Sequence, residues 1–260
     1  MLHPTRFNAL CAMSVPPVPL GGPVCPTEGM RAAAGENFMY ILYHNEVFTW
    51  TGDHGVAELE YDADCEGALR QMHFGGGQSS LADMERTITD PKRSAGGNIG
   101  RGPIGQGYTV WCTQPEFDYY VAEFERAGWR GGLNYYRNFD RNWRLLQKHG
   151  VASNKIDVPV HFIACLLDGV IGASQKVAAA AEAGCKARCT DFRGALFIED
   201  TGHWCQQEAD AAVNESLIAF CRSIDAPKLC ACRCVTFHSR VVQVVSFVPQ
   251  QVSPDIYLAC

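Results

Sequence analysis

Three short runs of apolar residues constrain the fold of this chain most strongly. They cover residues 9–15, 158–165 and 194–199. Continuous apolar runs of this length are typical of parallel strands that are buried on both faces. Apolar residues at helical spacing follow the second and third runs, at residues 174–183 and 209–221, and we expect Gly184 or Asp191 to end the first of these helices. The pattern predicts an α/β protein with a parallel sheet.

The stretch between the first and second runs is too long for a simple crossover connection. It is rich in aromatic residues, and helical spacing is clearest at residues 115–127 and 133–146. Ligands bind at the carboxyl ends of the strands in open α/β sheets. We therefore expect this stretch to form an inserted helical lid over that end of the sheet.

Composition and charge exclude several classes of function. The 260 residues carry a net charge of −6, and Lys and Arg do not cluster, which argues against binding to nucleic acid or to an anionic membrane. No window approaches the roughly 20 apolar residues that a membrane-spanning helix needs. The N-terminus lacks the pattern of a secretory signal, so the 13 cysteines are expected to be thiols. We expect a cytoplasmic protein.

The string from Asp200 to Glu208 carries the strongest chemical signal. His203 lies in it, between a predicted strand and a predicted helix, where an imidazole can take a proton from water. Asp168 ends the preceding apolar run, and an acid followed by a histidine, each after its own strand, is the chain order of one class of catalytic triads. Alternatively, Asp168 caps a helix and His203 is an ordinary loop residue. Together the two residues favour a catalytic pair.

Two further strings resemble the cap (lid) domain of soluble epoxide hydrolases, a family with the α/β-hydrolase fold. Residues 130–143 contain Gly-Gly-Leu-Asn-Tyr-Tyr-Arg-Asn, whose second aromatic, Tyr136, matches a tyrosine that faces the active site in that family. Residues 38–43, with residues 55–60 after them, resemble the other cap segment, and Tyr40 matches its functional tyrosine. The alternative for both tyrosines is packing in an aromatic core.

The resemblance extends from about His3 to Phe220 and implies a reaction. An aspartate opens the epoxide while the hydroxyls of Tyr40 and Tyr136 bind its oxygen, and water activated by His203, with Asp168 orienting the ring, then releases a vicinal diol. The expected partners are the epoxide substrate and water, and no cofactor or metal is expected. The additional residues expected to contact the substrate are Phe38, Tyr135 and Trp204.

The resemblance also implies which parts of the chain are core and which are lid. We expect a partial α/β-hydrolase sheet with an inserted helical cap. Residues 1–20 would be a remnant of the core, residues 21–150 the cap with an insertion near 47–54, residues 151–225 the C-terminal part of the core, and residues 226–260 an appended tail.

The nucleophile of the family lies on a turn before the segment that matches residues 9–15, so we expect it to be absent from this N-terminally truncated chain. Asp53 is an internal alternative, because it follows a strand-like run and a glycine. Against it, the resemblance places residues 47–54 in an insertion of the lid. A sheet without its upstream strands would expose an edge, which predicts aggregation or self-association.

Three alternatives remain for the function. The chain could be a catalytically inactive remnant of the fold. It could also act like a haloalkane dehalogenase, which shares the fold and the ester mechanism but binds a halide instead of using paired tyrosines. A zinc site is the third alternative, built from the tail residues Cys230, Cys232, Cys234 and His238.

Overall fold

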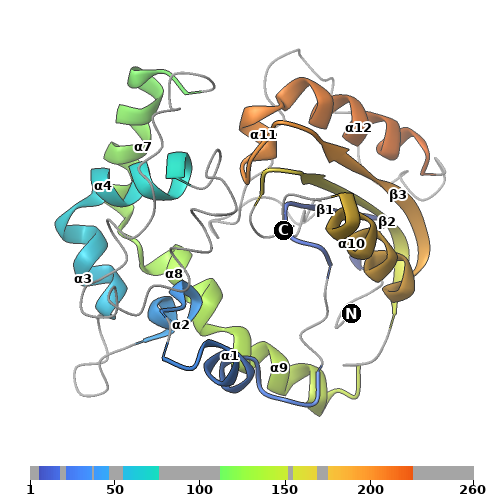
Figure 1. Cartoon of the computed structure of the whole chain (residues 1–260), viewed down its shortest axis with the longest axis horizontal. Helices are drawn as coiled ribbons and strands as arrows, with labels where there is room; N and C mark the ends of the chain where they lie inside the picture. Colours follow the sequence, from blue (N-terminus) through green and yellow to red (C-terminus); the bar gives the residue numbers. More distant parts are fainter. Residues whose placement is uncertain are drawn as a thin grey trace. The chain divides into compact units, whose positions relative to one another are not determined.

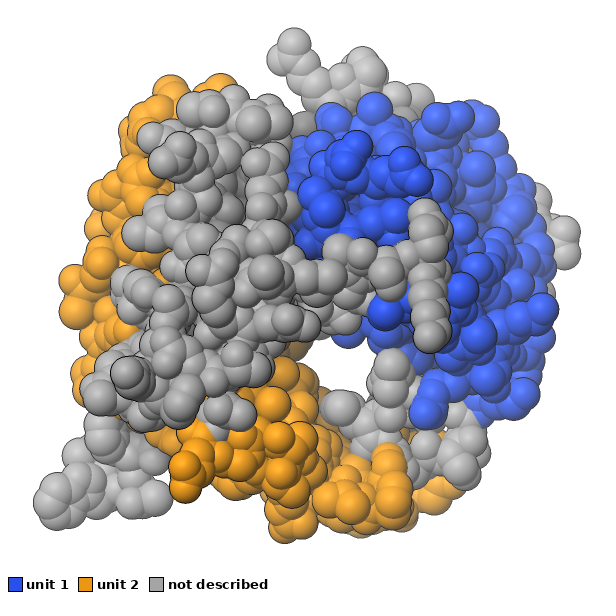
Figure 2. All heavy atoms as spheres, in the orientation of Figure 1, with its two compact units in different colours: residues 1–18, 154–260 blue, residues 19–153 orange. Residues whose placement is uncertain are grey.

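The computed structural model describes residues 6–17, 22–36, 38–46, 55–75, 112–151, 155–168 and 175–224. The chain divides into two compact units, one made of residues 1–18 and 154–260 and the other of residues 19–153 (Figure 2). The candidate nucleophile Asp53, the insertion at 47–54 and the tail at 226–260 lie outside the described residues.

The first unit is built on a parallel sheet of three strands in the order β1-β2-β3 (Figure 1). These strands are β1 (Leu10–Met13), β2 (Ile156–Cys165) and β3 (Cys189–Ile198). The α/β class and all three predicted strands are confirmed. The third strand begins five residues earlier than its apolar run, because its first half is partly polar. Association through a sheet edge stays a prediction.

Helices cover opposite faces of this sheet: α10 (Gln175–Arg188) on one and α12 (Asp210–Arg222) on the other. Successive side chains of a strand point to opposite faces. Phe162 therefore packs in the cluster that contains Cys185 of α10, while Ile163 packs in the cluster that contains Val213 of α12. Each fully buried side chain of this size contributes roughly 1.5–3 kcal/mol to the stability of the fold.

Two expectations about helix boundaries were wrong. Helix α10 continues through Gly184 to Arg188, and Asp191 lies within β3. A glycine inside a helix costs only about 1 kcal/mol, and the next residue, Cys185, is buried against the sheet. The helical pattern at residues 133–146 is divided by Asn138, whose side chain donates a hydrogen bond to the carbonyl oxygen of Asn134.

The described part of the second unit is helical. Helix α7 shows why one element begins and ends where it does: the backbone N–H of Thr113 donates to the side chain of Glu116 at 2.7 Å, and Gly128 follows the helix with a φ of 70°. Its helices, together with a π-helical turn at Arg70–Gly75, are α1 (Pro26–Ala34), α2 (Tyr40–Asn45), α3 (Val56–Ala63), α4 (Cys65–Leu69), α7 (Gln114–Ala127), α8 (Arg130–Arg137) and α9 (Phe139–Lys148).

The second unit has its own hydrophobic core and its own hydrogen bonds between helices. Tyr61, Phe117 and Trp129 are among the side chains buried in one cluster that joins α3, α4, α7 and α8. Asp140 of α9 accepts hydrogen bonds from the backbone and the hydroxyl of Thr27 at 3.1 and 2.6 Å. A carboxylate at the first turn of α1 satisfies a backbone donor that the helix leaves unpaired.

The described residues can be examined for a membrane-spanning helix and for a metal site. None of the helices there has the length and the apolar character that a membrane-spanning segment needs. The same residues contain no group of three or more His, Cys, Asp or Glu side chains arranged to hold a metal ion. The cysteines and the histidine of the zinc alternative lie in the tail, outside the described residues.

Candidate active site

The structure brings Asp168 and His203 together at the carboxyl ends of β2 and β3. The backbone N–H groups of Leu166 and Leu167 donate to the carbonyl oxygens of Ile198 and Thr201, at 2.9 and 3.0 Å, which joins the loops after the two strands. The Nδ1 atom of His203 then lies 3.0 Å from Oδ2 of Asp168. Because parallel strands end at the same edge, residues far apart in sequence meet here.

The surroundings of the pair suit an imidazole that exchanges protons with water. Asp168 is buried, with 1% of its side chain exposed, while 31% of the His203 side chain is exposed. Burial alone would lower the pKa of His203, but the hydrogen bond and the charge of Asp168 outweigh it, so that pKa lies above its ordinary value. A proton on Nδ1 faces the carboxylate, which leaves the Nε2 lone pair to act as a base.

The structure also brings Tyr40 and Tyr136 together, within the second unit. Tyr40 is the first residue of α2 and Tyr136 lies in α8, and their ring centroids are 5.9 Å apart with the planes nearly perpendicular. Tyr40 is 41% exposed and Tyr136 is half-buried. Burial, followed by the influence of Tyr40, raises the pKa of Tyr136 above its ordinary value, so its phenol stays protonated at neutral pH.

Helix α8 is held against α2 and α3 by polar groups beside the tyrosines. The side chain of Asn45 donates to the carbonyl oxygen of Tyr136 at 2.8 Å. Arg137 forms a double ion pair with Glu58, of which only 1% is exposed. A side chain at Gly55 would collide with the guanidinium of Arg137. These contacts fix the helix that carries Tyr136.

Sequence reasoning missed His44, which lies beneath both tyrosines. Only 4% of His44 is exposed, and its ring centroid is 4.6 Å from that of Tyr136 and 5.5 Å from that of Tyr40. Its Nε2 atom lies 2.6 Å from the hydroxyl of Tyr61. The signal in the sequence was the four-residue spacing between Tyr40 and His44, which places both on one helix face.

The environment of His44 makes the second unit sensitive to acid. Burial and the charge of Arg137 lower the pKa of His44 to about 4. The unfolded chain therefore binds this proton at a higher pH than the folded chain does, near the ordinary histidine value of about 6.5. The contribution of neutral His44 to stability is fully present above about pH 6.5 and is lost as the pH falls towards 4.

We expect the local unfolding free energy of α2 and α3 to fall by roughly 3 kcal/mol between pH 6.5 and pH 4 because of His44. Hydrogen exchange of peptides from α2 and α3, corrected for the intrinsic pH dependence, measures this quantity. The double variant His44→Phe with Tyr61→Phe removes the imidazole together with its hydroxyl partner, and it should lose that part of the pH dependence. The exposed His149→Gln serves as the control, and an equal loss there would contradict the assignment.

The other residues expected to contact substrate are placed as follows. Phe38 is half-buried, and its ring centroid is 5.6 Å from that of Tyr43. Tyr135 is 42% exposed on α8. The ring centroid of Trp204 lies 5.1 Å from that of His203, edge to face. Contact of these three side chains with a substrate stays a prediction.

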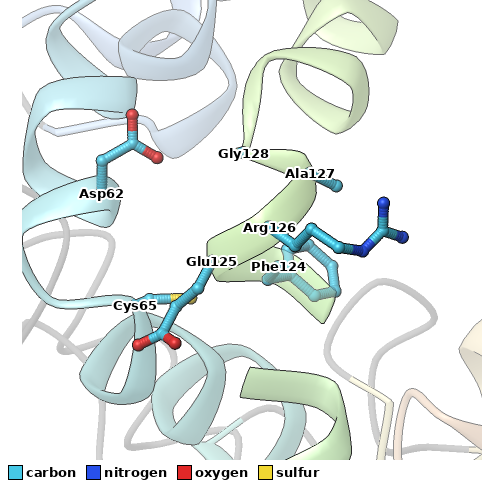
Figure 3. A pocket seen from close by; sticks show the side chains of 7 residues that line it. All are labelled: Asp62, Cys65, Phe124, Glu125, Arg126, Ala127 and Gly128. Atoms are coloured by element: carbon cyan, nitrogen blue, oxygen red, sulfur yellow. The ribbon is translucent and has the colours of Figure 1, made fainter. Parts of the chain in front are cut away.

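A hollow of about 390 Å³ in the second unit is lined by none of these residues (Figure 3). It is open to solvent, and its lining residues include Asp62, Glu125 and Cys65. We assign no role to it in the chemistry of the candidate site.

Known proteins similar to this chain are epoxide hydrolases. No family model matches the chain. Epoxide hydrolase A of Mycobacterium tuberculosis is 36% identical over 225 residues, which are 86% of this chain and 64% of that protein. The rat bifunctional epoxide hydrolase 2 is 28% identical over 223 residues, covering 86% of this chain and 36% of that protein.

Solved structures give the same result. The crystal structure of epoxide hydrolase A from Mycobacterium thermoresistibile matches with a TM-score of 0.72 and 37% identity, over 86% of this chain and 65% of that one. An epoxide hydrolase from an endophytic Streptomyces matches with a TM-score of 0.70 and 31% identity, over 85% of this chain and 62% of that one. The chain thus spans less than two thirds of the relatives it matches. It is a homologue of the epoxide hydrolases and shares part of their α/β-hydrolase fold.

Proposed function

We propose that this chain supplies the water-activating and oxygen-binding residues of an epoxide hydrolase, which converts epoxides to vicinal diols through an alkyl-enzyme ester. The single observation that supports this most directly is the pair formed by Asp168 and the part-exposed His203, with 3.0 Å between carboxylate and ring nitrogen. The names of the relatives point to the same reaction.

In the first step a carboxylate oxygen of the nucleophile attacks an epoxide carbon. The ring carbon–oxygen bond breaks, and its electron pair goes to the epoxide oxygen, which takes a proton from a tyrosine. Tyr40 and Tyr136 suit this role because a phenol is protonated at neutral pH and yet can stabilise or protonate an alkoxide. Their ring centroids lie 5.9 Å apart.

In the second step water attacks the carbonyl carbon of the ester. His203 takes the proton of that water on Nε2, while the carboxylate of Asp168 stabilises the resulting imidazolium. The ester bond to the substrate then breaks, and the imidazolium returns its proton to the departing alkoxide, which gives the diol. The nucleophile is released as a carboxylic acid, and its proton goes back through water to the tyrosine that was deprotonated in the first step. The carboxylate, the phenol and the neutral imidazole are thereby restored. No cofactor enters this sequence of steps.

The nucleophile is expected on a strand-to-helix turn ahead of residues 9–15, as in the family pattern that the chain resembles. Asp53 is the internal alternative, and it lies outside the described residues. The proposed activity therefore concerns the chain together with a segment that bears the nucleophile.

A cytoplasmic location of the protein stays a prediction as well.

The experiment joins the chain to the nucleophile-bearing segment of the Mycobacterium tuberculosis relative and compares it with the chain alone. Both proteins are incubated with an aryl epoxide, and the diol is quantified by chromatography. We expect diol from the joined protein and none above background from the chain alone. A joined protein that folds but forms neither diol nor a covalent ester, as followed by protein mass spectrometry, would identify the chain as an inactive remnant.

A further inference from the structure

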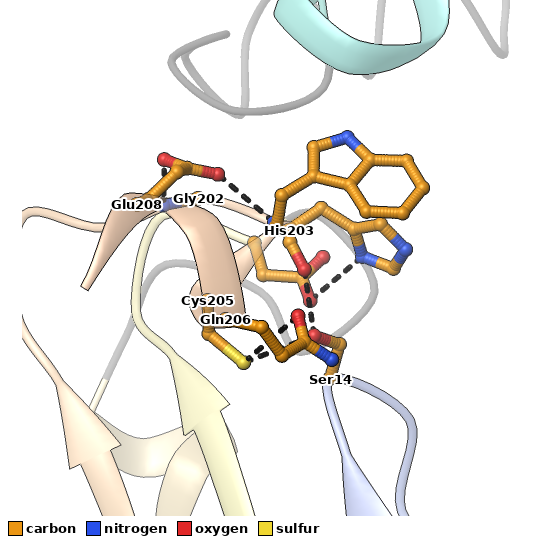
Figure 4. A network of polar contacts seen from close by, with 8 residues as sticks. Ser14, Gly202, His203, Cys205, Gln206 and Glu208 are labelled. Carbon is orange, nitrogen blue, oxygen red and sulfur yellow. Dashed lines mark hydrogen bonds and ion pairs between the residues drawn. The ribbon is translucent and has the colours of Figure 1, made fainter. Parts of the chain in front are cut away.

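In the loop that carries His203, backbone groups before and after the histidine form hydrogen bonds with side chains. The carboxylate of Glu208, in the short helix α11 (Cys205–Glu208), accepts hydrogen bonds from the backbone N–H groups of Gly202 at 2.8 Å and Trp204 at 2.9 Å (Figure 4). One side-chain carboxyl group thus spans the residues before and after His203. Hydrogen bonds to a carboxylate are shorter and stronger than those between neutral groups.

A second side chain reaches the same backbone from β1. The hydroxyl of Ser14 donates to the carbonyl oxygen of His203 at 2.6 Å. The peptide unit that joins His203 to Trp204 therefore has both polar groups bonded to side chains, its carbonyl to Ser14 and its N–H to Glu208. Because a peptide unit rotates as a rigid plane, holding both groups fixes the ψ angle of His203.

The ψ angle of a residue helps to determine where its Cα–Cβ bond points, and with it where the ring can lie. With the backbone in this conformation, the Nδ1 atom of His203 lies 3.0 Å from Oδ2 of Asp168. Asp168 is attached to a different strand, so the backbone of the His203 loop must be held independently for the two groups to stay aligned.

The backbone at Ser14 supports a specific role for its hydroxyl. Ser14 has a φ of 58°, in the left-handed region that few residues other than glycine adopt. Its backbone N–H donates to Ile163 at 2.9 Å, which holds the residue at the end of β1. Glycine would take this conformation without strain, but it would provide no donor to His203. Strained residues of this kind occur where surrounding contacts hold them.

We propose that Glu208 and Ser14 are positioning residues for the His203 imidazole. They act through the backbone on either side of the histidine and keep its ring aligned with Asp168. The effect of this alignment on diol formation rests on the proposed function, whereas the alignment itself is a property of the chain and can be measured without substrate.

The test follows the ring proton between His203 and Asp168 by NMR in the full chain labelled with ¹⁵N-histidine. Glu208→Gln keeps the shape of the side chain but leaves a single oxygen acceptor for two N–H donors. We expect the Nδ1–H proton of His203 to exchange with water about tenfold faster in this variant, or its signal to vanish, as loss of one ordinary hydrogen bond implies. Glu215→Gln, an identical change at an exposed position on α12, should leave the signal unchanged.

Ser14→Gly is the second variant, and it separates positioning from stability. It removes the hydroxyl from His203 while it relieves the left-handed backbone, so we expect a fold at least as stable as the parent together with faster exchange of the His203 ring proton. If Glu208→Gln does not fold, as judged by the dispersion of its amide signals, this variant decides the question alone.

Two results would overturn the proposal. In the first, both variants fold and the His203 ring proton keeps its chemical shift and its exchange rate, which means that the loop is aligned without them. In the second, both variants lose their fold, which means that the two side chains support the unit as a whole. Neither result depends on epoxide chemistry, so failure of this proposal is distinguishable from failure of the proposed function.

Discussion

The His203→Gln variant, joined to the nucleophile-bearing segment, is expected to hydrolyse the ester intermediate about 10³-fold more slowly than its parent. Glutamine keeps a polar side chain of similar size, but it cannot take a proton from water at neutral pH. Opening of the epoxide does not require this base, because the nucleophile and the tyrosines carry that step. The alkylated protein should therefore accumulate after a single turnover.

Protein mass spectrometry after mixing with the epoxide measures this directly, as an added mass equal to that of the substrate. The exposed His149→Gln in the second unit is the matched control and should turn over like the parent. Since the pKa of His203 is raised, ester hydrolysis in the parent should slow as the pH falls through that raised value, where the imidazole becomes charged. A variant without His203 that still releases diol at the parent rate would refute the assignment of the base.

The Tyr40→Phe and Tyr136→Phe variants are each expected to slow the opening of the epoxide by about 10²–10³-fold, and the double variant should show no measurable opening. Each change removes one hydroxyl and keeps the ring that packs in the aromatic cluster around His44. The loss therefore falls on stabilisation of the developing alkoxide and spares the fold.

The rate at which the alkylated protein appears, in a His203→Gln background that traps it, measures epoxide opening alone. Tyr43→Phe is the matched control, since Tyr43 lies on the same helix and its hydroxyl donates to Glu60 at 2.8 Å. That variant should be alkylated at the parent rate. Equal rates in the parent and in both tyrosine variants would exclude the hydroxyls from the reaction and would favour packing as their only role.

Much of the sheet could be predicted because parallel strands buried on both faces leave continuous apolar runs. All three runs are strands, and the alternation within β2 assigns Phe162 and Ile163 to opposite helices. The start of β3 could not be predicted in this way, because Thr190 and Arg193 interrupt the apolar pattern, while the residues between them, Asp191 and Phe192, pair with β2. The continuation of α10 through Gly184 likewise depended on packing against the sheet.

By itself, the sequence determined the three strands, the helical character of the stretch between the first two, and the placement of Asp168 and His203 at strand ends. The reason is that local periodicity and chain order record which residues are buried and which follow a strand. Only the tertiary structure decided how the histidine loop and the tyrosine pair are supported. Ser14 lies 189 residues from His203, and Arg137 lies 79 residues from Glu58. Contacts across such separations arise from packing between elements, which no local pattern of residues specifies.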